Sequence, residues 1–326
     1  MTNPNTSEII TTTLRHRAKQ IFDNVTNNNA LLYRLNERGN ILTAPGGRNI
    51  MEPIFYAENV TYTRYSGYDA LNISPSDVIS SAEYDWKQAA VAVSISGLEE
   101  MQNSGPDAYL DLLDARIENA EMTFENSLSE DCYSTGTASG SKQVGGLQLL
   151  VADDPTTGTV GGINRANFSF WRNIAFDATT DGGAAATSAN IQGYMNTVYL
   201  RTARGRDVVD MIIADNNYFK LYWESLQAIQ RITNEKMASA GFQNLKFMGA
   251  DVVFDGGIHF SGTGCPTNHM YFLNSKYIKF RPHSQRNMEP MGPDRYSVNQ
   301  DAVVKLVGWM GNMTLRGAKF QGILFD

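Results

Sequence analysis

The 326-residue chain has two cysteines, Cys132 and Cys265. Two thiols are too few for a disulfide framework, and a chain of this length can bury a core without one. A reducing compartment is therefore the expected environment. This scarcity argues against the class of small secreted domains that depend on disulfides.

The chain also lacks targeting and membrane signals. The first eight residues have neither the basic region nor the apolar region of a signal peptide. No apolar run approaches the ~18 residues that a membrane span needs. The sequence therefore predicts a protein of the cytoplasm with no membrane partner.

Basic charge is in deficit. The formal net charge is −7 and the pI is near 5.2. A duplex-binding surface normally needs an excess of Lys and Arg to displace counterions from phosphates. The balance argues against tight nucleic-acid binding by the chain as a whole, although a local basic patch stays possible. The hydrophobic fraction of 42% supports a sizeable core.

Catalytic and metal-binding motifs are missing as well. Cys265 and His269 have a Cys-x-x-x-His spacing, but a structural zinc site needs four ligands and the two other downstream histidines, His259 and His283, have no matching spacing. The stretch 136–142 lacks the spacing of a phosphate loop, and no Gly-x-Ser-x-Gly elbow occurs. Asp153 and Asp154 precede a proline and indicate a turn. We expect no enzyme activity, no catalytic residue, no cofactor and no metal.

The segment from Met51 to Ser96 is the most informative feature that is present. It holds two stretches rich in β-branched and aromatic residues, 59–65 and 85–95, joined by a polar connector. We interpret it as an extended β-hairpin. A lone hairpin is marginal in water, so this one is expected to rest on another chain.

Residues 7–36 have the apolar spacing of an amphipathic helix, which Gly39 and the 45–47 Pro-Gly-Gly sequence end. It could be an ordinary helix of the domain surface. We favour an N-terminal arm that docks on a neighbouring subunit, because the Pro-Gly-Gly hinge separates it from the rest of the chain.

A helix of about twenty-five residues is expected from Pro106 to Asp131, with an apolar stripe on one side and acidic residues on the other. A helix at 189–202, a buried strand at 208–214 and a helix at 216–233 indicate an α/β block. Strands dominate the last ninety residues, the longest at 302–309.

Five groups of residues, in this order, resemble the major capsid proteins of tailed double-stranded DNA bacteriophages, which have the Hong Kong 97-type shell fold. They are 12–18 with 27–32 (N-terminal arm), 65–69 with 84–88 (extended loop), 111–121 (spine helix), 161–165 with 170–173 (entry to the axial domain) and 299–302 (last peripheral strands).

The resemblance implies an α+β capsid fold with a definite division. Residues 1–50 would be the N-terminal arm, 51–96 the extended hairpin loop, 97–134 the spine helix of the peripheral domain, 135–243 the α/β axial domain, and 244–326 the peripheral-domain sheet. Some relatives carry an additional N-terminal segment that acts as an internal scaffold. Since this chain starts with its arm, a separate scaffolding protein is expected. No lysine lies between Ser66 and Glu83, so the lysine–asparagine cross-link of some relatives is not expected.

The resemblance also implies the function: a shell subunit that assembles with itself, through hexamers and pentamers, into an icosahedral virion capsid around phage DNA. Portal and possibly decoration proteins would be further partners, with weak non-specific contact to the packaged DNA. Assembly would take place in the bacterial cytoplasm. The alternatives are an encapsulin-like nanocompartment shell and, more remotely, a cytoplasmic α/β hydrolase.

The residues expected at contacts between subunits come from the arm and the hairpin. Trp86 has a special place among them, because it starts the returning strand; it would otherwise belong to the subunit's own core. The expected set is Leu14, Ile21, Leu32, Tyr62, Arg64, Tyr65, Tyr68, Tyr84 and Trp86.

Overall fold

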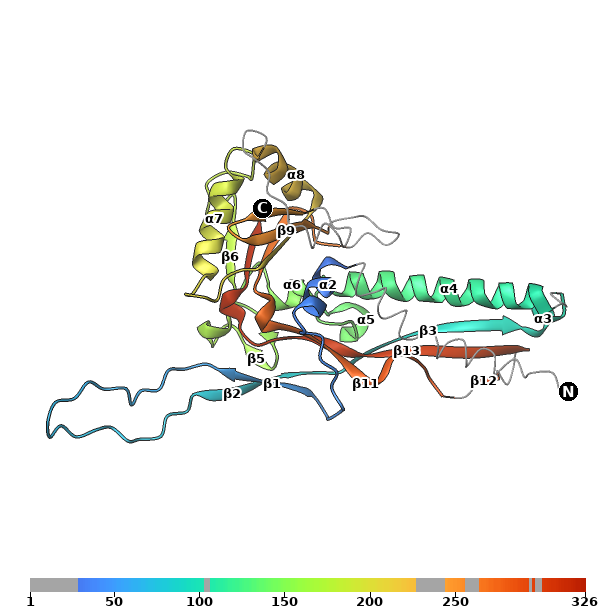
Figure 1. The fold of residues 1–326 in the computed structure, drawn as a ribbon, viewed down its shortest axis with the longest axis horizontal. Coiled ribbons are helices and arrows are strands. Elements are labelled where there is room, and N and C mark those ends of the chain that lie inside the picture. The colour runs from blue at the N-terminus through green and yellow to red at the C-terminus, as the bar shows by residue number, and fades with distance from the viewer. Residues whose placement is uncertain (1–28, 103–105, 227–243, 256–263, 293–294, 297–300) are drawn as a thin grey trace.

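The computed structural model describes residues 29–102, 106–226, 244–255, 264–292, 295–296 and 301–326. The molecule is elongated (Figure 1). A β-hairpin extends from one end, a long helix lies along two long strands at the other end, and a block of sheet and helices stands between them. The expected α+β class is confirmed.

The block is built on a six-stranded sheet. Its strand order is β6 (Ile174–Asp177), β14 (Gly322–Phe325), β10 (His269–Leu273), β7 (Met211–Ala214), β9 (Ala250–Phe254) and β8 (Asn244–Phe247). Strands β14–β6 and β7–β9 pair in parallel and the other neighbours antiparallel. Helices α7 (Ile191–Thr202) and α8 (Asn216–Ser225) pack on one face through a shared apolar cluster.

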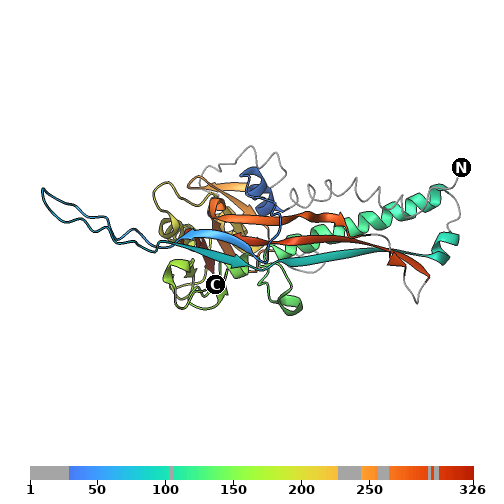
Figure 2. The same cartoon turned by 90° about the horizontal axis from the view of Figure 1, so that it is seen from below.

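A second sheet runs away from the block. Its long strands are β11 (Ile278–Pro290), β13 (Ala302–Leu315) and β3 (Lys87–Ser96), with the short β12 (Arg295–Tyr296). Strand β13 pairs with β3 along its length, from Ala302 opposite Ser96 to Gly311 opposite Lys87. Helix α3 (Gly97–Gln102) turns the chain, and α4 (Pro106–Asp131) returns along β3, as both views show (Figure 2).

The predicted long helix is therefore confirmed. Pro106 occupies its first position, where a missing N–H costs little. Part of its apolar stripe, Ile117 and Ala120, packs against Val93 and Ile95 of β3. Further along, Phe124 and Leu128 enter the main core.

One core joins the two sheets. Ile213 and Tyr271 of the block share it with Phe280 and Trp309 of the long sheet. The remaining elements are short. They are the helices α5 (Ala138–Ser141) and α6 (Leu147–Leu150), the strands β4 (Thr159–Val160) and β5 (Ile163–Asn164), and the 3₁₀ helices η1 (Ser169–Trp171), η2 (Ser275–Tyr277) and η3 (Ala318–Phe320). A continuous core makes the block and the long sheet one folding unit.

Helix α2 (Ala30–Glu37) is the part of the expected 7–36 helix that the described residues include. Asn29 caps it by accepting from the Leu32 N–H, and Gly39 follows its end with a φ of +69°, as helix C-termini favour. Its Leu31, Leu32 and Leu35 are buried in the main core. The expectation that this stretch docks on a neighbour is therefore wrong for residues 30–37.

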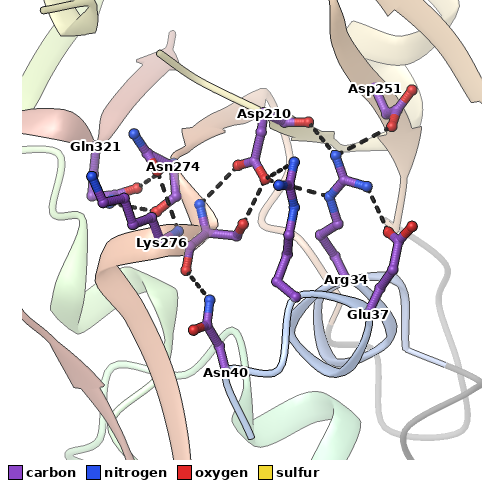
Figure 3. A network of polar contacts seen from close by, with 10 residues as sticks. Arg34, Glu37, Asn40, Asp210, Asp251, Asn274, Lys276 and Gln321 are labelled. Atoms are coloured by element: carbon purple, nitrogen blue, oxygen red, sulfur yellow. Dashed lines mark hydrogen bonds and ion pairs between the residues drawn. The ribbon is translucent and has the colours of Figure 1, made fainter. Parts of the chain in front are cut away.

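A polar network fastens α2 to the block (Figure 3). Arg34 pairs with Glu37 at 2.7 Å, with Asp210 at 3.4 Å and with Asp251 at 3.5 Å. Asp210 in turn accepts from the main-chain N–H of Ser275 at 2.8 Å. The helix that the Pro-Gly-Gly sequence seemed to isolate is thus tied to the sheet by charge as well as by apolar packing.

Two further expectations on topology are wrong. Residues 59–65 form no strand, and 87–96 pair with β13 instead of a hairpin partner. The strands from 244 to 326 do not make one sheet either: β8, β9, β10 and β14 belong to the block, and β11, β12 and β13 to the long sheet. Propensity indicates strands, but which strands pair depends on contacts far apart in sequence.

Candidate assembly interface

The base of the observed hairpin is a short antiparallel ladder. Strand β1 (Ile50–Phe55) pairs with β2 (Ile79–Tyr84), with Ile50 opposite Tyr84 and Phe55 opposite Ile79. Burial alternates along β1, so that Ile50, Glu52 and Ile54 face the core. The base of the hairpin is therefore packed on its own subunit.

Glu52 is the charged anchor of this base, and it is fully buried. Its carboxylate accepts from Arg281 Nε at 2.7 Å and from Lys279 Nζ at 3.2 Å, and Arg316 Nε lies 3.6 Å away. The Thr314 hydroxyl adds a contact at 3.4 Å. A buried carboxylate with this many partners holds β1 against β11 and β13 and sets the direction in which the hairpin leaves the subunit.

The opposite strand is held by Tyr84, which is buried and packs beside Gly161. Gly161 has a φ of +58°, and a Cβ there would lie 2.9 Å from that of Ala82 and 3.0 Å from the Tyr84 ring. Its carbonyl accepts from the Glu83 N–H at 2.9 Å. Glycine is needed here both for the backbone angle and for this close approach.

Beyond the base, residues 56–78 form a long loop without helix or strand. A few polar contacts shape it. Asn59 Oδ1 accepts from the Thr61 N–H at 2.9 Å and, across the loop, from the Ser76 hydroxyl at 2.8 Å. The Tyr56 N–H donates to the Val78 carbonyl at 3.2 Å.

The loop exposes large apolar side chains. The exposed fractions are 79% for Tyr62, 65% for Tyr65, 108% for Tyr68 and 91% for Ile73, and Val60 and Leu71 are exposed as well. Soluble monomers rarely leave such a group uncovered on a projecting segment. The arrangement is typical of a surface that another protein covers, so the loop is the candidate interface.

A groove lies beside the hairpin base, on the side of the block. It has a volume of about 1000 Å³. Residues 53–58 of the hairpin form one wall, and η1, the end of α7, η2 and η3 form the other. Two aromatic pairs line it: Tyr56 with Phe170, whose ring centroids are 5.5 Å apart, and Tyr277 stacked on Phe320 at 4.4 Å.

The structure brings four of the expected interface residues together. Tyr62, Arg64, Tyr65 and Tyr68 all lie exposed on the loop. Their participation in a contact between subunits stays a prediction. Leu14 and Ile21 lie outside the described residues.

Leu32 and Tyr84 are a correction, because both are buried inside their own subunit. Trp86 is half-buried and also has partners there. Its Nε1 donates to the Gly47 carbonyl at 2.9 Å, and its ring meets that of His283 edge-on at 5.3 Å. These contacts support the alternative that Trp86 belongs to the subunit.

Sequence reasoning missed the aliphatic members of the loop, Val60, Leu71 and Ile73. The signal was their position: apolar residues without helical or strand period in a polar stretch that has no lysine. It also missed Glu52, since nothing local in the sequence marks a glutamate that three distant cations will surround.

Of the residues considered for chemistry, Cys265, His269, Asp153 and Asp154 make contacts within the subunit, and His259 lies outside the described residues. Cys265 is buried, and its Sγ lies 3.5 Å from the His269 carbonyl. His269 Nε2 lies 3.2 Å from Asp153, and Asp154 accepts from Thr156 in a turn, which lowers the pKa of Asp154. Among the described residues, no group of three or more His, Cys, Asp or Glu could hold a metal ion. None of the described helices is both long and apolar enough to cross a membrane.

No family model matches the chain, and no curated protein matches it. Solved structures do. The cyanophage A-1(L) capsid asymmetric unit is 14% identical with a TM-score of 0.65, over 88% of this chain and 90% of the other. The capsid of Myoviridae phage XM1 is 12% identical with a TM-score of 0.54, over 90% and 91%. The satellite phage P4 procapsid including the size determination (Sid) protein is 11% identical with a TM-score of 0.53, over 94% and 96%. The chain has the fold of these phage capsid subunits.

Proposed function

We propose that this protein is the major capsid protein of a tailed double-stranded DNA bacteriophage. It self-assembles through hexamers and pentamers into an icosahedral shell that encloses the genome. Its role is structural and not enzymatic, and its final location is the virion, after assembly in the bacterial cytoplasm.

One observation carries the proposal: a subunit with the capsid fold presents a long loop of exposed tyrosines and aliphatic residues. The exposed apolar side chains of the loop would be buried when another subunit packs on them. Because Glu52 fixes the base of the hairpin, the loop is already oriented before a neighbouring subunit binds. Permanent interfaces of this kind bury upwards of ~2,000 Å².

The proposed division of the chain follows the observed sheets. The hairpin (50–84) is the extended loop. Helix α4, β3, β11, β12 and β13 form the peripheral part, and the six-stranded sheet with α7 and α8 forms the axial part. Residues 1–28 remain the proposed arm.

Partners other than the chain itself are expected from the proposed role. A separate scaffolding protein, a portal and possibly decoration proteins would act with the shell. The net charge of −7 supports a wall to which packaged DNA adheres only weakly, since like charges repel.

Expression of the full chain, followed by electron microscopy and sedimentation, tests the proposal. Closed particles or curved sheets with five- and six-fold units are expected. A protein that stays monomeric at high concentration, with and without phage scaffolding protein, would contradict it. Small closed particles that hold protein cargo instead of DNA would favour a nanocompartment.

A further inference from the structure

The groove beside the hairpin base gathers positive charge in a chain whose formal net charge is −7. The cationic residues that line it are Arg201, Arg204, Lys276, Arg316 and Lys319, against the acidic Glu58 and Asp207. Residues 201–206 are the densest part of this charge, with three arginines in six positions. The acidic balance of the whole chain leaves room for a local basic patch, and the groove is such a patch.

Part of this charge already has a partner. Lys276 pairs with Asp207 at 2.7 Å, and Arg316 lies 3.6 Å from the buried Glu52. Arg204 lies 3.6 Å from Glu58, but both side chains are largely exposed, so water screens this pair and Arg204 can exchange its partner.

Three further cations have no such partner. Arg201, Arg206 and Lys319 are exposed, and none of them has an ion pair with another residue that the structure describes. Arg201 lies over the ring of Phe176, 5.7 Å from its centroid. This contact orients the guanidinium without neutralising its charge.

The turn that carries Arg206 is fixed by its own backbone. Arg204 and Asp207 exchange both main-chain hydrogen bonds, at 2.9 and 3.0 Å. Gly205, the first residue between them, has a φ of +60°, a conformation that favours glycine. Since Arg204 and Asp207 line the groove, the turn presents Arg206 to solvent beside it.

The arrangement suits a polymer of regularly spaced negative charges. The unpaired cations come from three separate segments: the end of α7, the turn 204–207 and η3. A chain of phosphates can meet all three, and a guanidinium binds a phosphate through two parallel hydrogen bonds. The same groove contains half-buried aromatic rings, which are those of Tyr56, Phe170, Tyr277 and Phe320. Cations beside aromatic rings are typical of surfaces that bind nucleic-acid strands.

We propose that the groove and the turn 204–207 bind the phosphodiester backbone of a nucleic acid. Arg201, Arg206 and Lys319 contact the phosphates, and Arg204 exchanges Glu58 for one of them. This inference rests on the proposed function and deepens it, because it names the surface at which a subunit of net negative charge contacts the nucleic acid that the shell encloses.

Fluorescence anisotropy with the full-length protein tests the binding. The probes are a labelled DNA duplex and a labelled single strand, each about 20 nucleotides long, and each is titrated from 50 to 300 mM salt. The variant Arg201→Gln, Arg206→Gln and Lys319→Gln removes the three unpaired cations. The matched control, Arg48→Gln, Lys142→Gln and Lys220→Gln, removes the same charge from exposed positions that do not line the groove.

The groove variant is expected to bind the duplex more than about tenfold more weakly at 50 mM salt. The slope of log affinity against log salt should fall by about 3, because each phosphate contact contributes about 0.9 to it. The control should stay within about twofold of wild type. Equal affinity for the two probes would support recognition of the backbone alone, and tighter binding of the single strand would add the aromatic rings to the contact.

Three results would overturn the proposal. They are no binding by the wild type at 50 mM salt, equal losses in the two variants, and poly-glutamate binding to the groove as tightly as the DNA probes. The last result would make the groove a site for acidic peptides.

Sedimentation of the same preparations separates this inference from the shell function. Particles without nucleic-acid binding overturn the site and leave the shell standing. Binding with the expected salt slopes, in a protein that forms no particles, supports the site and contradicts the shell.

Discussion

The hydroxyl of Tyr84 bonds to both main-chain groups of Leu315. It donates to the Leu315 carbonyl at 3.0 Å and accepts from the Leu315 N–H at 3.1 Å. One side chain of β2 thus acts as a short rung between the hairpin and β13. Burial raises the pKa of Tyr84 far above its usual value, so the hydroxyl stays protonated and able to donate.

Tyr84→Phe removes this rung while keeping the ring. We expect the free energy of unfolding to fall by about 1–3 kcal/mol, since buried main-chain groups lose a partner. Denaturant unfolding measures the loss. Tyr62→Phe, at an exposed position, is the control and should change little. Equal stability of the two variants would show that the rung contributes nothing.

The hairpin illustrates the reach and the limit of sequence reasoning. The sequence correctly predicted an extended hairpin, but the prediction put both of its strands at the wrong residues. Residues 59–65 have the β-branched and aromatic composition of a strand and no partner. The true strand, β1, contains Pro53, which propensity disfavours and which an isolated two-stranded ladder tolerates. Val91 pairs with Val307, a choice that no local pattern reveals.

Glu52→Gln should destabilise the subunit by about 3 kcal/mol, because Lys279 and Arg281 would share a buried neutral amide in place of a carboxylate. Lys279 and Arg281 are both partly exposed and can turn toward water. The expected loss is therefore at the lower end of the ~3–5 kcal/mol that breaking a buried ion pair costs. Glu83→Gln, an exposed change in the same hairpin, is the control. A loss of less than 1 kcal/mol in both variants would contradict the anchoring role.

Arg34→Leu tests whether α2 belongs to the subunit. The change should cost about 3 kcal/mol or more, because the buried Asp251 and the partly exposed Asp210 lose the guanidinium between them. Arg38→Leu removes an exposed cation from the same Asp210, at 3.3 Å, and should cost about 1 kcal/mol or less. Thermal unfolding of both variants gives the comparison; a larger loss at Arg38 would overturn it.

The ion pairs of Arg34 show why the sequence-based prediction extended the N-terminal arm too far, to include α2. The amphipathic spacing of residues 7–36 was visible, and so was the stop at Gly39. The partners of Arg34 lie just before β7 and on β9, far along the chain, so burial of α2 could not be inferred. Removal of residues 1–47 would therefore take out part of the core, and not merely an arm.

His269 predicts a dependence of stability on pH. Burial alone would lower the pKa of His269, but the bonds to Asp153 and to the Thr267 carbonyl raise it above its usual value. A raised pKa in the folded state stabilises the protein below about pH 6.5, and this stabilisation is lost as the pH rises through the folded-state pKa.

Unfolding of wild type and Asp153→Asn, measured from pH 5.5 to 8.5, checks this dependence. At the acid end of this range, the wild type should have a higher free energy of unfolding than Asp153→Asn. The free energies of the two proteins should converge toward the alkaline end. A difference that stays constant across the range would show that the pair does not titrate with folding.

Trp86 and Tyr68 separate folding from assembly. Trp86 is half-buried against its own subunit, so Trp86→Ala should lower the free energy of unfolding by about 2–3 kcal/mol, near the lower end of the cost for a large core aromatic.

Tyr68 contacts only solvent, so Tyr68→Ala should leave the free energy of unfolding of the subunit within about 0.5 kcal/mol of wild type. Its particle yield should nevertheless collapse, because a large aromatic lost from an interface costs roughly 2 kcal/mol at every copy. Circular dichroism with denaturant gives the first quantity and sedimentation the second. Normal particles from Tyr68→Ala would mean that the loop end is not an interface, whatever the outcome at Trp86.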